Sequence, residues 1–192
     1  RERLLQWSQN YEPAAMLDLA IAVDARPIAG NAALFEPLQR QIAALGGNDG
    51  LMRQFAAPAL AFHTPLTFFG KVRTDEHGLD IKKGGIFPIV QGLRALALKH
   101  GITETNSFRR ADLLVEAGAL HERDARDAQQ ALSVFLRLRL TDQLRKLKQG
   151  EAIDNHIDVA ALRRLDRELL RDALRVVNQF KDLVAERFRL GG

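Results

Sequence analysis

The 192-residue chain contains no cysteine, and this absence excludes several classes of protein. Disulfide scaffolds, thiolate zinc sites and cysteine nucleophiles all require a thiol. The same absence fits a reducing compartment, so we expect a cytoplasmic protein. No apolar run approaches the ~20 residues of a membrane-spanning helix, and the first residues lack the pattern of a signal peptide.

Motifs that carry catalysis or bind metals are missing as well. The five histidines form no H-x-x-x-H or H-x-H pair, so we predict no metal site in this chain. There is no G-x-S-x-G elbow, no Walker motif and no Asp-x-Asp pair. The sequence therefore contains no complete active site.

The composition that remains favours helices. Hydrophobic residues make up 46% of the chain, which is enough for a core, while aromatic residues make up only 6%. Alanine, leucine, arginine and glutamate are plentiful, and most of these are strong helix formers. The net charge of +4 is modest and its charges are interspersed. This balance suits a small anionic ligand or an acidic partner surface, and it argues against nucleic acid as a partner despite the pI near 9.8.

Helical periodicity extends over most of the chain, with glycines and capping residues between the periodic segments. We predict helices over residues 1–10, 31–45, 51–62, 86–100, 107–117, 124–149 and 159–189, the last as one long helix or two. The connections after residue 86 are short, which predicts antiparallel neighbours in a helical bundle. In the segment 124–149 we expect one apolar stripe, formed by Ala128, Leu132, Leu136, Leu140, Leu144 and Leu147.

Short apolar stretches predict a few strands beside these helices. Residues 16–23 (MLDLAIAV) are flanked by Pro13 and Pro27, which favours a buried strand over the helix that leucine and alanine also allow. Residues 67–72 and 79–81 flank a polar loop and predict the two arms of a small β-hairpin. Such a hairpin is marginally stable alone, so it should lie on helices.

A basic glycine turn, KKGG, precedes the predicted helix 86–100 and is the first candidate binding element. Lys82 and Lys83 would lie beside the free N–H groups of a helix N-terminus, where a phosphate or carboxylate can be held. A tight turn that needs the torsions of Gly84 and Gly85, with two solvated lysines, explains the same residues. Their spacing matches neither a Walker loop nor a dinucleotide fingerprint.

Other candidates are single polar residues. Arg139 and Gln143 share one edge of the leucine-rich helix, where Arg139 either reaches for an anion or pairs with an internal acid. Arg94 lies on the predicted helix 86–100, and the same two alternatives, an anion or an internal acid, apply to its side chain. Asn155 lies in a linker, where it caps the last helix or binds a ligand. Asp24 ends the apolar stretch 16–23, and it is either a metal-binding or catalytic acid at a strand end or a turn residue paired with the nearby Arg26.

Three segments together resemble a known family. Residues 81–102 (IKKGGIFPIVQGLRALALKHGI), residues 135–158 (FLRLRLTDQLRKLKQGEAIDNHID) and the last long helix are similar to the C-terminal, substrate-binding domain of bacterial nucleotidyltransferases. Those proteins often carry CBS or cyclic-nucleotide-binding regulatory domains, and their wider relatives are protein-PII uridylyltransferase and glutamine synthetase adenylyltransferase. The resemblance covers about residues 50–190. Upstream, LAIAVDARPIAGNAAL resembles the last strand and exit of the family's catalytic domain, with Asp24, Arg26 and Gly30 at the matching positions.

The resemblance implies an architecture and a chemistry. It implies a remnant of an α/β nucleotidyltransferase catalytic domain over residues 1–47, followed by a helical substrate-binding domain over 48–192. The family's Gly-Ser turn and Asp-x-Asp pair would lie before Arg1, so the chain is expected to be inactive alone and to need no cofactor. The full-length enzyme would use Mg²⁺ and a nucleoside triphosphate. In that enzyme Asp24 is the candidate third carboxylate, and the helical domain would line the cleft with Lys82, Lys83, Gly84, Gly85, Arg94, Arg139, Gln143 and Asn155.

The resemblance implies two kinds of partner: the upstream catalytic and regulatory domains of the same signal-transduction polypeptide, and an acceptor substrate that is either acidic or a protein. The leucine stripe supports an alternative function, a helical interaction or homodimerisation module without a ligand.

Overall fold

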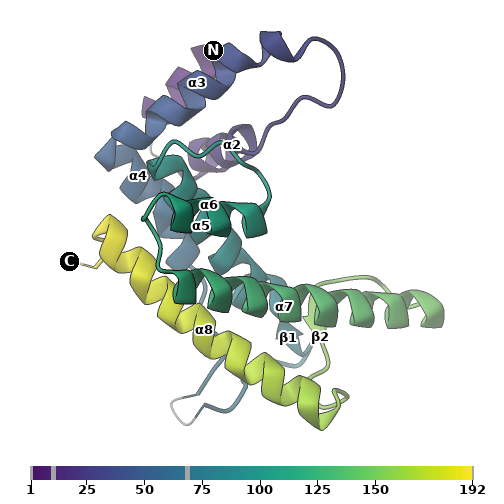
Figure 1. Cartoon of the computed structure of the whole chain (residues 1–192). Helices are drawn as coiled ribbons and strands as arrows, with labels where there is room; N and C mark the ends of the chain where they lie inside the picture. The colour runs from purple at the N-terminus through teal and green to yellow at the C-terminus, as the bar shows by residue number, and fades with distance from the viewer. Residues whose placement is uncertain (1, 10–11, 68–69, 192) are drawn as a thin grey trace.

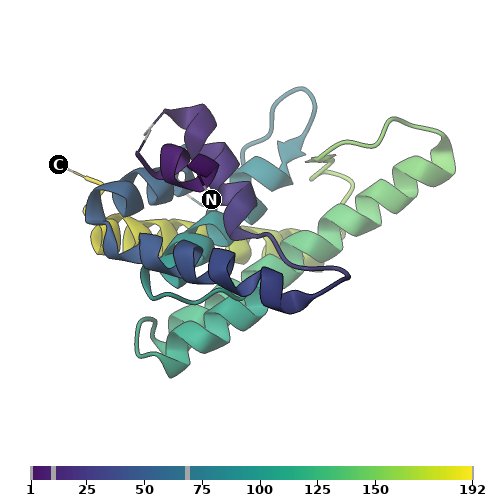
Figure 2. The same ribbon diagram turned by 90° about the horizontal axis from the view of Figure 1, so that it is seen from above.

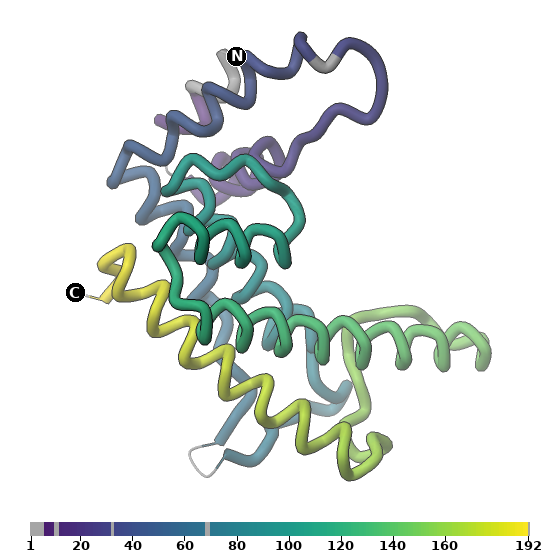
Figure 3. The backbone as a smooth tube through the Cα atoms, in the orientation of Figure 1, coloured from purple at the N-terminus to yellow at the C-terminus, as the bar shows by residue number. Residues whose placement is uncertain are grey.

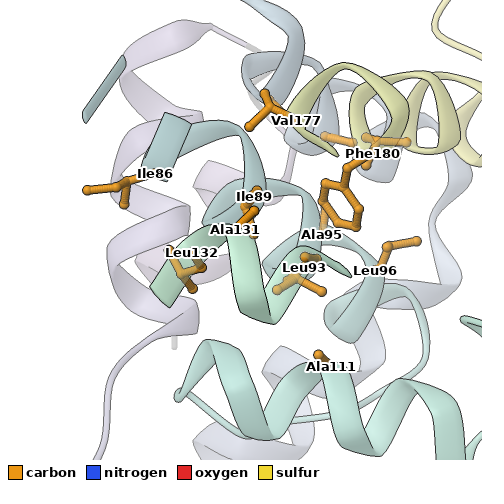
Figure 4. Close-up of a cluster of buried hydrophobic side chains, with 14 of the residues drawn as sticks. Ile86, Ile89, Leu93, Ala95, Leu96, Ala111, Ala131, Leu132, Val177 and Phe180 are labelled. Atoms are coloured by element: carbon orange, nitrogen blue, oxygen red, sulfur yellow. The ribbon is translucent and has the colours of Figure 1, made fainter. Parts of the chain in front are cut away.

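Helix α5 (Phe87–Lys99) is the central element of the computed structural model, which describes residues 2–9, 12–67 and 70–191. Most of its side chains are buried, including Ile89, Leu93 and Leu96. It contacts α4 (Asp49–Ala56), α6 (Ser107–Glu116) and α8 (Arg164–Phe188). Figure 4 shows apolar side chains of α5 through α8 converging around this helix. The core of the fold therefore lies around α5.

Helices α6, α7 (Glu122–Gln149) and α8 complete the bundle (Figure 1). The colour gradient in Figure 3 shows that α7 and α8 run in roughly opposite directions, and they pack along each other. The C-terminal half of α7 extends beyond the other helices in both ribbon views (Figures 1 and 2). The predicted mainly helical bundle is confirmed, and its last segment is one helix rather than two. In the described ranges, no helix has the length and apolar character needed to cross a membrane.

The N-terminal segment corrects the predicted strand over residues 16–23. Those residues lie in helix α2 (Pro13–Val23), between α1 (Glu2–Gln9) and α3 (Glu36–Ala44). Pro13 occupies the first helical turn, where its missing N–H costs nothing. Met16, Leu19 and Val23 are buried on one side of α2, whereas Leu17 and Ile21 are exposed. This three-to-four-residue period is helical, and the apolar run concealed it.

The small sheet has a different pairing from the predicted hairpin. Strand β1 (Leu79–Asp80) pairs antiparallel with β2 (His156–Ile157), in the linker before α8. The expected partner segment closes on itself instead, because Val72 pairs with Leu66 in an isolated bridge. Phe68 and Phe69 of that segment lie outside the described residues. A two-stranded antiparallel sheet is present as expected, but it joins distant parts of the chain.

The basic glycine turn is helical. Residues Lys82–Ile86 form a π-helical segment, η4, that continues directly into α5. A Cβ atom on Gly84 would lie 2.8 Å from the Pro65 ring, and one on Gly85 would lie 2.8 Å from the Phe135 ring of α7. Both contacts are too short, so these glycines are required by close packing. The predicted tight turn is wrong, and both glycines lie inside a helix.

The predicted leucine stripe of α7 divides into a buried and an exposed part. Its first members, Ala128 and Leu132, are buried, but its four later leucines are exposed. In the extended half of α7 the buried positions are instead Phe135, Leu138 and Lys146. Steps of four residues drift by about 40° per step around an α-helix, so the stripe turns away from the bundle.

Candidate functional site

Four predicted site residues come from elements that meet at one corner of the fold, which we call the polar corner: Lys82, Arg139, Gln143 and Asn155. Gly85 of η4 packs against Phe135, one turn before Arg139 on α7. The backbone N–H of Ile81, next to Lys82, donates to the carbonyl oxygen of Asn155 at 3.0 Å. The three elements that carry these residues are therefore held together, although no hydrogen bond joins the four side chains to one another among the described contacts.

The linker before α8 is fixed to α7 by polar side chains. Gln143 Nε2 donates to the carbonyl oxygen of Asp154 at 3.0 Å. Lys146 Nζ donates to Asp154 Oδ1 at 2.5 Å and to the carbonyl oxygen of His156 at 2.6 Å, and it lies 2.8 Å from Asp142 Oδ2. Burial opposes the charge of Lys146, but the hydrogen bonds to both carboxylates outweigh it and raise the pKa of Lys146. Gln143 and Lys146 thus position the backbone beside Asn155.

Two buried polar atoms of the polar corner have no hydrogen-bond partner among the described residues. They are Arg139 Nε, a donor, and Asn155 Oδ1, an acceptor. Most buried polar atoms in folded proteins are hydrogen-bonded, so unpartnered ones require an explanation. The alternative prediction that Asn155 caps the last helix is wrong, because α8 begins at Arg164, nine residues later.

The two lysines of η4 project into solvent beside the polar corner. Lys82 and Lys83 are exposed. Lys83 Nζ lies 3.5 Å from Asp80 Oδ2, and the Lys83 backbone N–H donates to Asp80 Oδ1 at 2.9 Å. Asn155 and Asp80 accept bonds from the backbone N–H groups of Ile81 and Lys83, so these two N–H groups are not free for the predicted anion. The side chain of Lys82 makes no ion pair with a described residue and remains available for an anion.

Arg94 faces away from the polar corner. It follows Gly92 by two residues, or about 200° around the helix, and Gly92 packs against Phe180 of α8. Arg94 Nε and Nη2 donate to Asp24 Oδ2 at 3.0 and 2.5 Å. Arg94 and Arg139 therefore do not share one wall.

Asp24 joins two arginines, and neither of them is the predicted Arg26. Arg110 Nη2 of α6 donates to its Oδ1 at 2.5 Å, and Arg94 binds the other oxygen. Burial would raise the pKa of Asp24, but the hydrogen bonds and charges of Arg94 and Arg110 hold that pKa below its ordinary value. Burial lowers the pKa of Arg110, and the charge of Arg94 adds to this effect. Asp24 thus ties α2 to α5 and α6.

A mainly apolar groove of ≈ 520 Å³ lies beside this ion cluster, between α2, α4 and α5. The polar residues that line it are Gln54, Gln91 and Arg94. Gln91 is buried, donates to the carbonyl oxygen of Phe55 at 2.6 Å and accepts from Arg94 Nη1 at 2.5 Å. Within the described ranges, no group of three or more histidine, aspartate and glutamate side chains is arranged to hold a metal ion.

Sequence reasoning missed two buried cations. Arg110 belongs to the ion cluster around Asp24, and Lys146 fixes the linker to α7. Each sits on the apolar face of its helix. Arg110 precedes Ala111 and lies four residues before Leu114, which are both fully buried, and Lys146 lies two turns after Leu138. A cation on the apolar face of a helix is a readable signal of a buried ion pair.

Comparison with protein families matches residues 49–188 to the family described as "Putative nucleotidyltransferase substrate binding domain". The match covers well over half of the chain, and the chain belongs to this family. Neither the search of curated proteins nor the search of solved structures found a match.

Proposed function

We propose that this chain is the substrate-binding, cleft-closing part of a signal-transduction nucleotidyltransferase, which transfers a nucleoside monophosphate from a triphosphate to an acceptor. The family membership of residues 49–188 carries the proposal. The catalytic carboxylates, the Mg²⁺ ions and the regulatory domains would belong to upstream parts of the polypeptide. The helical domain would supply one wall of the cleft and would be inactive alone.

We place the substrate contacts at the polar corner. A guanidinium, an ammonium and two amides suit phosphate oxygens and base edges. The unpartnered Arg139 Nε and Asn155 Oδ1 support this placement, since a ligand with an acceptor and a donor would satisfy both atoms. Gly84 and Gly85 contribute indirectly, because they let the lysine-bearing segment approach α7.

The remaining predicted residues receive different roles in the proposal. Lys83 contributes positive charge at the rim, alongside its ion pair with Asp80. Arg94 and Asp24 hold the N-terminal segment against the helical domain. A third-carboxylate role for Asp24 would require the full-length enzyme to separate it from both arginines.

The polar corner is tested by measuring how tightly the chain binds nucleoside triphosphates. Titration calorimetry, with and without Mg²⁺, gives this affinity. Loss of a charge-assisted hydrogen bond costs about 1.5–3 kcal/mol, so Arg139→Gln should weaken binding by about tenfold or more. Arg40→Gln is the matched control, because Arg40 is exposed on α3, far along the chain from the corner. Equal affinities of the two variants would remove the corner from the proposal.

An assay of nucleotidyl transfer by the isolated chain tests the proposal that the chain is inactive alone. With Mg²⁺, labelled triphosphate and a general acceptor mixture, we expect no release of pyrophosphate above the blank. Transfer by this chain alone would show that the active site is not upstream.

A further inference from the structure

A row of leucines is exposed on the half of α7 that extends beyond the bundle. The exposed fractions are 39% for Leu136, 57% for Leu140, 48% for Leu144 and 62% for Leu147. At about 100° per residue these four positions fall within about 80° of arc, and they span about 16 Å along the helix. The row is therefore a continuous apolar strip, and single exposed leucines scattered over a surface would not have this arrangement.

The start of α8 adds to the same surface. Leu165 and Leu169 are 67% and 38% exposed. Between the two helices, Arg137 Nη2 donates to Asp166 Oδ1 at 2.9 Å. On α7, Leu136 and Leu140 lie on either side of Arg137 in the sequence. On α8, Leu165 and Leu169 lie on either side of Asp166 in the same way. Because α7 and α8 run in roughly opposite directions (Figure 3) and Arg137 lies opposite Asp166, the leucines at the start of α8 lie beside the first leucines of the α7 row.

The charges around the leucine row of α7 have mainly one sign. Residues 137–149 contain five basic residues and one acidic residue, Asp142. The Asp142 side chain is only 12% exposed and is paired with Arg145 and Lys146. Arg139 and Lys148 make no ion pair with any described residue. The strip on α7 is thus flanked by cations, and Asp142 is turned inward and neutralised. On α8, the acids beside the leucines, Asp166 and Glu168, are paired with Arg137 and Arg164.

We propose that this surface binds an amphipathic helix of a partner protein, with an apolar stripe and acidic flanks. We call it the leucine platform, and it consists of Leu136, Leu140, Leu144, Leu147, Leu165 and Leu169. A helix with a continuous exposed apolar strip accepts another helix that buries the strip, and the leucines at the start of α8 add to that contact. Acidic side chains on that third helix would pair with Arg139 and Lys148, which fixes its charge and its orientation.

The same features bear on other occupants. A second copy of the chain would bring its own cationic strip against this one, and like charges in contact oppose association. A lipid surface also accepts a helix with leucines on one face and basic residues on the other, so binding to vesicles is one of the outcomes tested below. The strip on α7 is long and narrow, which suits a rod-shaped partner better than a flat one.

A pair of synthetic helical peptides tests the proposal with the chain as it stands. Both peptides are three heptads long with leucine at positions a and d, one with glutamate and the other with lysine at positions e and g. Fluorescence anisotropy of the labelled peptides should show binding of the glutamate peptide, with at least tenfold weaker binding of the lysine peptide. Failure of the glutamate peptide to bind, or equal binding of both peptides, overturns the proposal.

Matched variants locate the binding surface. Leu140→Asp with Leu144→Asp should weaken binding of the glutamate peptide at least tenfold. The control is Leu17→Asp with Ile21→Asp, an exposed i, i+4 pair on α2 with similar exposure, 63% and 66%, and it should change binding less than twofold. Lys148→Glu should weaken binding several-fold, and Arg40→Glu, with the same change in net charge, should not.

Two further measurements separate the other occupants. Sedimentation of the chain without peptide should show a monomer, and co-flotation with vesicles of anionic phosphatidylglycerol should show no binding. A dimer, or vesicle binding, that the Leu140/Leu144 variant abolishes would assign the platform to a second copy or to a membrane and would refute the acidic helix.

Discussion

Asp24 is a single carboxylate that balances two guanidinium groups, and its replacement by asparagine should be costly. The side chains of Arg110 and Arg94 are only 2% and 14% exposed, and Asp24 is their shared ion-pair partner. Asparagine keeps the size of the side chain but removes its charge. The variant Asp24→Asn therefore leaves both cations in place, largely out of water, without a counter-charge.

The expected cost follows from this burial. Removing one member of a fully buried ion pair typically destabilises a protein by about 3–5 kcal/mol. Asp24 itself is 30% exposed, so water reduces the loss, and we expect about 2–3 kcal/mol. The loss should be concentrated where Asp24 acts, at the junction of α2 with α5 and α6. We expect the N-terminal segment to open more readily while the bundle around α5 stays folded.

Hydrogen exchange measures this local opening. Amides of α2 should exchange about 30- to 150-fold faster in Asp24→Asn, while amides of α5 and α8 should change much less. Asp18→Asn is the matched control, because Asp18 is exposed on the same helix and forms no ion pair with the described residues. Equal exchange in the two variants would refute the role that we assign to the Asp24 cluster.

The dependence on pH gives a second check. The pKa of Asp24 in the folded chain lies below the ordinary value of 3.8, because Arg94 and Arg110 outweigh the effect of burial. A lowered pKa stabilises the fold at pH values above the unfolded pKa, and this contribution is lost as the pH falls through the folded pKa. The difference between wild type and Asp24→Asn should therefore be full at neutral pH and shrink below pH 3.8. A difference that did not change with pH would have another cause.

Three further predictions follow from other contacts. Gly85→Ala places a Cβ atom 2.8 Å from the Phe135 ring, and it should lower stability by about 1–3 kcal/mol in urea unfolding, whereas Gly47→Ala, which meets no atom within 4 Å, should not. Lys146→Met leaves Asp142 and Asp154 without their shared buried cation, and it should lower the free energy of unfolding by about 1–3 kcal/mol. Urea unfolding measures this loss, and unchanged stability would contradict the prediction. Burial and two neighbouring cations lower the pKa of His100, so its NMR titration midpoint should lie below 6.5 and protonation should weaken the fold as the pH falls from 6.5 through that midpoint; a midpoint at or above 6.5 would contradict this.

The helices of the bundle were predictable because their limits are local. The helix predicted over residues 107–117 is α6, which is capped by the side chain of Asn106 at its start. Gly118 and Gly150 have φ values of +66° and +71° just after α6 and at the end of α7, where glycine tolerates the left-handed conformation. Caps and terminating glycines act within a few residues, so the sequence pattern contains them.

The pairings were not predictable because they depend on distant segments. Asp24 and Arg110 are 86 residues apart, and β1 finds its partner in the linker before α8. Short apolar runs have the same composition in a strand and in a helix, which explains the error at residues 16–23. The sequence likewise places Gly84 and Gly85 next to two lysines, but only packing shows that Pro65 and Phe135 require them.

The polar corner and the leucine platform are connected through α7. Arg139 and Gln143 lie between the buried face of that helix, at Phe135, and the exposed strip, at Leu136 and Leu140. A helix seated on the strip would pair with Arg139 and would change the charge available at the polar corner. Because coupling between two binding sites is reciprocal, nucleotide bound at the corner should shift the affinity of the glutamate peptide by the same factor that the peptide shifts nucleotide binding. Equal peptide affinity with and without saturating nucleotide would show that the two surfaces act independently.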